Sequence, residues 1–131
     1  MAYTQERKPT LILVVDDEKQ VVEAICEFLI GCGHAAIGAT SASKALELVK
    51  AKSGDVSLVI MDVLLDDQLG PIVIDEMLDI QQDLKVLYLS GEAQDEAVFR
   101  SQSKLPLAML HKPCPLGTIA RTVEQLMSTK L

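Results

Sequence analysis

Five polar side chains in this sequence stand directly or almost directly after short apolar runs. They comprise three carboxylates, one hydroxyl group and one ammonium group: Asp16, Asp17, Asp62, Ser90 and Lys112. If the apolar runs are parallel strands of one sheet, their carboxyl ends meet along a single edge and bring these side chains together. Clustered carboxylates repel one another, and a hard divalent cation relieves that repulsion. The pattern therefore predicts a Mg²⁺ site, because Mg²⁺ prefers oxygen ligands and keeps positions for water and phosphoryl oxygens.

A lysine and a serine beside such a site indicate phosphoryl transfer. The Lys112 ammonium group can pair with one phosphoryl oxygen, and the Ser90 hydroxyl group can donate to another. One carboxylate must then act as the nucleophile. We expect this to be Asp62, because the run before it is apolar enough to be a central strand buried on both faces.

The elements that position these residues follow from the hydrophobic pattern. Five apolar runs alternate with segments whose apolar residues have helical spacing, which predicts a doubly wound α/β domain. We expect the strands at residues 11–15, 34–39, 56–61, 85–89 and 107–110. The first helix should bury one face made of Val21, Ile25, Phe28 and Leu29. A helix at 95–103 should be the least stable, because it has few large apolar residues.

Length and composition exclude several classes of protein. The 131 residues predict one domain at 10–131, preceded by an extension at 1–9. The net charge of −7 argues against direct binding of nucleic acid, and the apolar runs are far shorter than the roughly 20 residues of a membrane span. Three cysteines form an odd set without framework spacing, so we expect a cytoplasmic protein that does not insert into membranes.

Four stretches of the chain, in order, resemble the motifs of the receiver domains of two-component response regulators. They are 14–18 (VVDDE), 58–62 (LVIMD) with Gly70 eight residues on, 86–91 (VLYLSG) and 110–113 (LHKP). The resemblance covers residues 11–126 and implies the (βα)5 flavodoxin-like receiver fold, a five-stranded parallel sheet with helices on both faces. The stretch Leu89-Ser90-Gly91, with Gly70-Pro71 further upstream, is similar to receivers of hybrid histidine kinases.

The resemblance also implies roles for the acidic residues. The aspartate that matches Asp62 accepts a phosphoryl group from a phosphohistidine, on a histidine kinase or a histidine phosphotransfer protein. The acid that matches Asp17 binds Mg²⁺ directly, together with Asp62 and the backbone carbonyl group at Leu64. The acid that matches Asp16 acts mainly through water.

The same resemblance assigns phosphoryl oxygens to Ser90 and Lys112 and a cis peptide bond to Lys112-Pro113. Two residues depart from the family pattern. Asp66 stands where proline is usual, so we expect a less constrained loop after the phosphoacceptor and additional negative charge near the site. Met109 stands where a switching tyrosine or phenylalanine is frequent, which removes the usual aromatic switch.

The leading interpretation is a phosphoacceptor domain of a two-component phosphorelay, which switches the binding of a downstream effector. It would catalyse only its own phosphorylation and dephosphorylation. Two alternatives remain open: a Mg²⁺-dependent phosphatase or phosphotransferase with an aspartyl-phosphate intermediate, and a receiver-like binding module that is never phosphorylated. The first lacks an aspartate two residues after Asp62, where Leu64 stands. A single-domain regulator and the receiver of a larger protein both fit the sequence.

Overall fold

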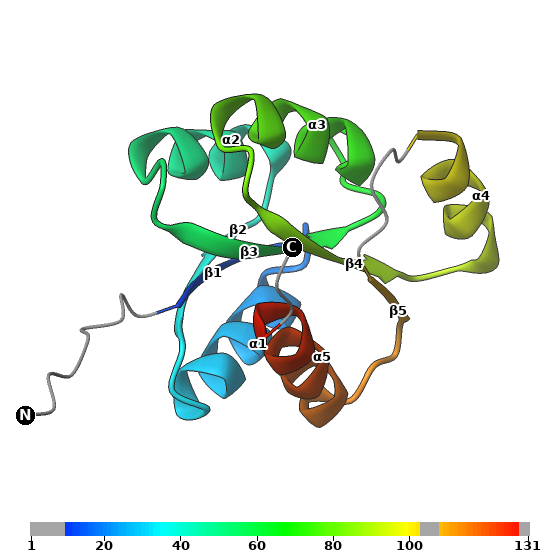
Figure 1. The fold of residues 1–131 in the computed structure, drawn as a ribbon. Helices are drawn as coiled ribbons and strands as arrows, with labels where there is room; N and C mark the ends of the chain where they lie inside the picture. Colours follow the sequence, from blue (N-terminus) through cyan, green and yellow to red (C-terminus); the bar gives the residue numbers. More distant parts are fainter. Residues whose placement is uncertain (1–9, 103–107, 129–131) are drawn as a thin grey trace, which may run out of the picture.

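A parallel sheet of five strands forms the centre of the computed structural model (Figure 1). The structure describes residues 10–102 and 108–128. The strands are β1 (Leu11–Val15), β2 (Ala35–Ala39), β3 (Val56–Asp62), β4 (Lys85–Ser90) and β5 (Met109–His111). The helices are α1 (Lys19–Gly31), α2 (Ala42–Ala51), α3 (Gly70–Ile80), α4 (Ala93–Gln102) and α5 (Leu116–Ser128). The predicted extension at 1–9, the start of the fifth strand at 107 and the end of the fourth helix at 103 lie outside the described residues.

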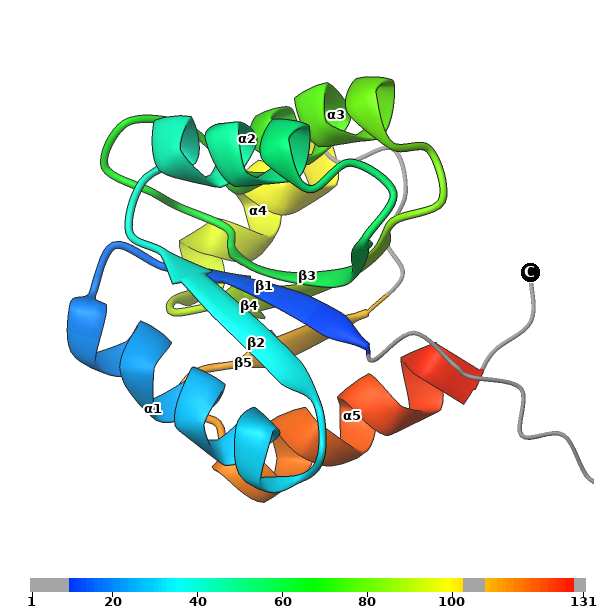
Figure 2. The same ribbon diagram turned by 90° about the vertical axis from the view of Figure 1, so that its left-hand side faces the viewer.

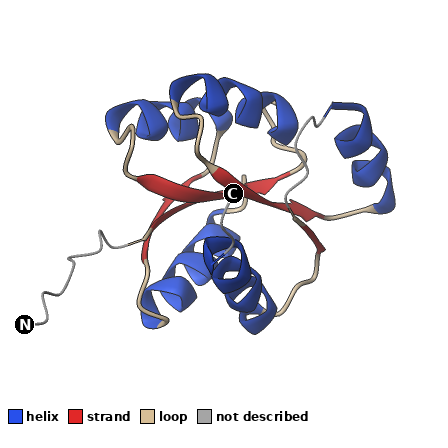
Figure 3. Ribbon diagram, in the orientation of Figure 1, coloured by secondary structure: helices blue, strands red, loops and turns tan. Residues whose placement is uncertain are grey.

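The strand order β2-β1-β3-β4-β5 confirms the doubly wound α/β fold. All four neighbouring pairs of strands are parallel. Helices α1 and α5 cover one face of the sheet, and α2, α3 and α4 lie on the other, as Figures 2 and 3 show. The order reverses between β1 and β3, and in such sheets the crevice beyond the carboxyl ends at that point is where ligands bind.

Alternating side chains of the central strands build two separate cores. In β1, Leu13 and Val15 pack toward α2 and α3, whereas Ile12 and Val14 pack toward α1 and α5. In β3 the four residues of 58–61 are completely buried. Because both faces of β1 and β3 are buried, their sequences are mostly continuous apolar runs and do not alternate between apolar and polar residues.

The prediction for the buried face of α1 was partly wrong. Ile25 and Leu29 are buried as expected, but Val22 is buried in place of Val21, and Phe28 is 38% exposed. The reason is a close approach between α1 and β2: the side chain of Val22 occupies the space that a Cβ atom at Gly38 would need. Gly38 on the neighbouring strand therefore leaves room for the side chain of Val22.

Three strands end at the residues that carry the candidate chemistry. The pairing of β3 with β4 continues through Asp62 and Leu89, and the pairing of β4 with β5 continues through Ser90 and His111. The backbone N–H of Lys112 then donates to the Ser90 carbonyl oxygen at 2.7 Å. Strand pairing therefore fixes the backbone of these residues.

Gly70, the first residue of α3, provides a test of how tightly the chain is packed behind Asp62. An alanine Cβ here would overlap the backbone carbonyl oxygen of Asp62 and lie 3.0 Å from Cγ of Met61. We expect Gly70→Ala to lower the free energy of unfolding by about 1–3 kcal/mol. Urea denaturation in EDTA measures this change.

Gly117→Ala is the matched control for this substitution. Gly117 lies in α5, and nothing stands within 4 Å of a Cβ added there. Alanine should therefore be neutral or stabilising by up to about 1 kcal/mol, because it favours the helix more than glycine does. Equal losses of stability in the two variants would contradict the close approach at Gly70.

Candidate functional site

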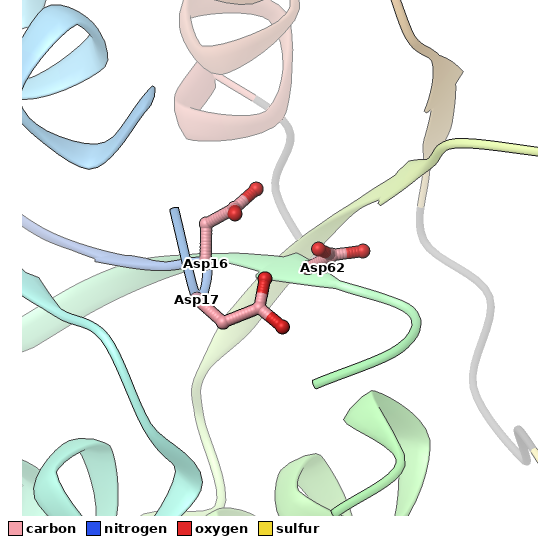
Figure 4. A group of neighbouring side chains, drawn as sticks. All are labelled: Asp16, Asp17 and Asp62. Carbon is pink, nitrogen blue, oxygen red and sulfur yellow. The ribbon is translucent and has the colours of Figure 1, made fainter. Parts of the chain in front are cut away.

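Three aspartates meet at the carboxyl ends of β1 and β3 (Figure 4). One carboxylate oxygen from each of Asp16, Asp17 and Asp62 lies within 4.8 Å of the others, and we call this group the acidic cluster. Asp16 and Asp62 are buried, whereas Asp17 is half-buried. The sequence predicted this proximity, because the ends of adjacent parallel strands lie at one edge of the sheet. Such hard oxygen donors fit Mg²⁺.

Lys112 brings positive charge into the acidic cluster. Its Nζ atom donates to Oδ2 of Asp16 at 2.6 Å and to Oδ2 of Asp62 at 3.2 Å. Burial lowers the pKa of Lys112, but the hydrogen bond to Asp16 and the charge of Asp62 outweigh this effect and raise it. The ammonium group therefore stays charged. The expected cis peptide bond between Lys112 and Pro113 is present.

Asp16 has both carboxylate oxygens engaged within the protein. Oδ2 accepts from Lys112, and Oδ1 accepts from the backbone N–H of Glu18 at 2.9 Å. Its carboxylate is almost completely buried. These bonds fix Asp16 in a charge-paired position at the start of α1, while Asp17 remains partly open to solvent.

The electrostatic surroundings of Asp62 oppose its ionisation. Burial raises its pKa to about 6, and the nearby charge of Asp16 adds to this effect. The Lys112 ammonium group and the backbone N–H of Leu64 act in the opposite direction, because both stabilise the carboxylate. Leu64 donates to Oδ1 of Asp62 at 3.3 Å. Near neutral pH, Asp62 is therefore mostly ionised and poorly solvated.

A short hairpin after β3 holds Leu64 beside Asp62. Leu64 and Leu69 form an antiparallel bridge. Its two hydrogen bonds run from Leu65 N–H to the Gln68 carbonyl oxygen at 3.1 Å and from Gly70 N–H to the Val63 carbonyl oxygen at 2.7 Å. Both bonds belong to neighbours of the bridged pair, so the bridge does not use the carbonyl group of Leu64.

Comparison with known proteins identifies the family. The profile of the response regulator receiver domain matches residues 12–124. This chain belongs to that family. Among curated proteins it is similar to the sensor kinase CckA of Brucella abortus (strain 2308), with 28% identity over 116 residues that cover 88% of this chain. This receiver domain spans 12% of the length of that kinase.

Solved structures agree with the fold of this receiver domain. The crystal structure of a response regulator receiver protein from Sinorhizobium medicae WSM419 has a TM-score of 0.80 and 24% identity, and covers 93% of this chain and 97% of its own. The receiver domain of the hybrid histidine kinase CckA has a TM-score of 0.77 and 22% identity, and covers 90% and 99%. Within residues 10–102 and 108–128, no helix has the length and apolar character needed to cross a membrane.

Hydrogen bonds at both its base and its tip constrain the loop after β3 in this receiver domain. The hairpin at Leu64 orders its base, and the Asp67 carboxylate accepts hydrogen bonds from backbone N–H groups of α2. Asp66 supplies the expected negative charge: burial, a hydrogen bond with Asp66 and the charge of Asp66 together raise the pKa of Asp17. Asp66 thus faces the acidic cluster, while Asp67 turns away to α2.

Ser90 lies at the same edge, at the end of β4, but its hydroxyl group turns toward the following loop. Its Oγ donates to the Glu92 carbonyl oxygen at 3.2 Å. Asp95, which the sequence did not single out as a site residue, accepts from the backbone N–H groups of Gly91 at 2.8 Å and Glu92 at 2.9 Å. An acid three residues after a helix N-cap is the signal that could have revealed it. It escaped notice because the helix begins at Ala93 rather than at 95.

The position of Met109 has aromatic neighbours even though it is not aromatic itself. Met109 pairs with Tyr88 across β4 and β5. The buried Tyr88 ring contacts the Phe99 ring of α4 edge to face, with ring centroids 4.7 Å apart. This aromatic contact holds α4 against β4, two residues before Ser90.

The raised pKa of Asp62 gives the fold a pH dependence when divalent cations are absent. The folded protein holds this proton up to a pKa of about 6, whereas unfolded chains lose it near pH 3.9. The resulting stabilisation is complete below about pH 4 and is lost as the pH rises through about 6. We expect Asp62→Asn, which cannot ionise, to be more stable than the wild type at about pH 7 by on the order of 1–3 kcal/mol.

Urea denaturation of both proteins in EDTA, at several pH values, measures this difference. Other titrating groups such as Asp17 are present in both proteins and largely cancel in the comparison. The advantage of the variant should shrink as the pH falls toward about 4, where Asp62 is protonated in both states of the wild type. A difference that is independent of pH would contradict the burial of an ionised Asp62.

Proposed function

We propose that this receiver domain accepts a phosphoryl group on Asp62, from a phosphohistidine of a histidine kinase or a histidine phosphotransfer protein. The observation that carries the proposal is the position of Asp62 at the end of the buried strand β3, 3.2 Å from the Lys112 ammonium group and within the acidic cluster. A carboxylate that is paired with an ammonium group and poorly solvated is well placed to attack phosphorus.

In the proposed reaction, an Asp62 carboxylate oxygen forms a bond to phosphorus while the bond from phosphorus to the donor histidine nitrogen breaks. The electron pair of the broken bond stays on the imidazole, which takes up a proton. Lys112 pairs with one phosphoryl oxygen, for which it needs to move little, because it already lies beside Asp62. Ser90 donates to another after its hydroxyl group leaves the Glu92 carbonyl oxygen. Positioning and charge neutralisation thus do most of the catalysis.

The residues that would hold Mg²⁺ in this proposal are Asp17, Asp62 and the backbone carbonyl group of Leu64, with Asp16 acting through water. The partly open carboxylate of Asp17 and the hairpin at Leu64 support this set. Asp16 is already paired with Lys112 and Glu18, which supports its indirect role. When bound, the ion supplies positive charge that offsets the carboxylates and the phosphoryl oxygens.

The donor protein must bring its histidine to this edge of the sheet. The surface beside Lys112 is apolar and could contact the donor protein. A hollow of about 550 Å³ opens between α1 and the start of α5, and Val21, Pro113 and Leu116 are among its lining residues. Val21, which the sequence placed in the core, is half-buried against that core and also lines this hollow. We propose that the donor docks here, next to the acidic cluster.

We further propose that the domain spans residues 10–131, follows an extension at 1–9 and works in the cytoplasm as a signalling domain. Its only catalysis would be the formation and hydrolysis of its own acyl phosphate, and its phosphorylation would switch the binding of an effector protein. The acidic net charge of −7 supports a protein partner rather than direct binding of nucleic acid.

Phosphoramidate, whose phosphorus–nitrogen bond resembles that of phosphohistidine, tests the phosphoacceptor. In the presence of Mg²⁺ the wild type should gain the mass of one phosphoryl group, and Asp62→Asn should gain none, because it lacks the nucleophilic oxygen. Asp79→Asn, which removes an exposed carboxylate of α3, is the control and should be labelled like the wild type. Labelling of Asp62→Asn would contradict the assignment, and fast turnover of a small phosphate ester would point to an enzyme.

Mg²⁺ should stabilise the folded protein through Asp17. A cation that binds only the folded state adds RT ln(1 + [Mg²⁺]/Kd), which is about 2.7 kcal/mol at 100 times Kd. We expect Asp17→Asn to lose most of the rise in thermal midpoint that Mg²⁺ produces in the wild type, whereas Asp79→Asn should keep it. An equal rise in the wild type and Asp17→Asn would show that the ion binds elsewhere.

A further inference from the structure

Two segments that are far apart in the sequence are joined beside the acidic cluster by one carboxylate. Oδ1 of Asp67 accepts from the backbone N–H of Ala42 at 3.0 Å, and Oδ2 accepts from that of Ser43 at 3.3 Å. Asp67 belongs to the loop between β3 and α3, and the two N–H groups are the first two of α2. Backbone hydrogen bonds, the one from Ala42 first, lower the pKa of Asp67, so this carboxylate stays ionised.

Helix α2 has its unpaired N–H groups satisfied by two residues from different parts of the chain. Ser41, the N-cap, accepts from Lys44 N–H, the third of the helix, at 3.1 Å. This leaves the first two N–H groups, which no carbonyl group inside the helix can reach. Asp67 takes both of them. The positive end of the helix also favours a carboxylate at this place.

The loop that Asp67 holds is the one that faces the acidic cluster. Leu64 lies at its start, next to Asp62, and Asp66 lies immediately before Asp67 and faces Asp17. The hairpin bonds at Leu65 and Gly70 fix the base of the loop. Its tip, at residues 66–67, is exposed to solvent. Both carboxylate oxygens of Asp67 tie this tip to the first turn of α2.

We propose that Asp67 is a positioning residue, which holds the β3–α3 loop against α2 so that the Leu64 carbonyl group and the Asp66 carboxylate are in place before a divalent cation arrives. The proposal rests on the proposed function, because it concerns the same Mg²⁺ site. A loop that must become ordered when a ligand binds loses affinity through its conformational entropy. Because the hydrogen bonds of Asp67 order the loop when the protein folds, this entropy is lost during folding and not when the cation binds.

Mg²⁺ titration by calorimetry, with the full chain, tests this role. We expect Asp67→Ala to weaken Mg²⁺ binding roughly 3- to 10-fold. This is about the entropic cost of immobilising one side chain on binding. Asp67→Asn keeps one oxygen acceptor for an N–H group of α2 and should recover part of the affinity. Ser41→Ala is the matched control, because it removes the cap of the same helix without touching the loop, and should bind Mg²⁺ like the wild type.

Amide hydrogen exchange in EDTA gives a second readout that does not depend on the cation. In Asp67→Ala the amides of Leu65 and Gly70 should exchange faster than in the wild type, whereas in Ser41→Ala they should not. Unchanged Mg²⁺ affinity in Asp67→Ala, or an equal loss in Ser41→Ala, would overturn the proposal, since Asp67 would then serve only the stability of α2. Unchanged exchange at Leu65 and Gly70 would overturn it as well.

The outcomes also separate this inference from the proposed function. If the wild type binds Mg²⁺ but is not phosphorylated, the phosphoacceptor proposal fails, while the affinities of the variants still decide the role of Asp67. If the wild type is phosphorylated and Asp67→Ala binds Mg²⁺ equally well, only the positioning role fails. If Mg²⁺ does not bind the wild type at all, both proposals fail together.

Discussion

The contact of one ammonium group with two buried carboxylates is the interaction on which the carboxyl edge of this receiver domain depends. Lys112 follows β5, Asp16 follows β1 and Asp62 ends β3, so the two ion pairs join segments from three strands. Lys112 pairs with two of the three carboxylates of the acidic cluster, and burial still raises the pKa values of Asp17 and Asp62, so their desolvation is not fully offset. The edge is therefore poised to bind positive charge.

The rest of the fold makes this unfavourable arrangement rigid. Residues 58–61 of β3 are completely buried, and β1 beside them is almost as deeply covered. The close approach of Gly70 to the Asp62 backbone hinders the segment around Asp62 from relaxing away from its neighbours. A site with this much buried charge persists because the two apolar cores on either side of the sheet outweigh its cost.

Aspartates at this edge fall into two groups with different tasks. One group is the acidic cluster of Asp16, Asp17 and Asp62. The other is Asp67 and Asp95, whose carboxylates accept hydrogen bonds from the backbone N–H groups of nearby segments. The second group shapes the loops after β3 and β4. The same residue type thus supplies both the clustered charge at the ends of β1 and β3 and the hydrogen bonds that shape the neighbouring loops.

The sequence by itself determined the alternation of strands and helices and the edge at which Asp16, Asp17 and Asp62 meet. These follow from local periodicity and from the rule that parallel strands end together. Only the tertiary structure decided that Val22 is more deeply buried than Val21, because the room for Val22 is provided by Gly38, a residue of the neighbouring strand. It also decided that Asp67 turns to α2 while Asp66 faces Asp17, since a contact between residues 25 positions apart leaves no periodic signal in the chain.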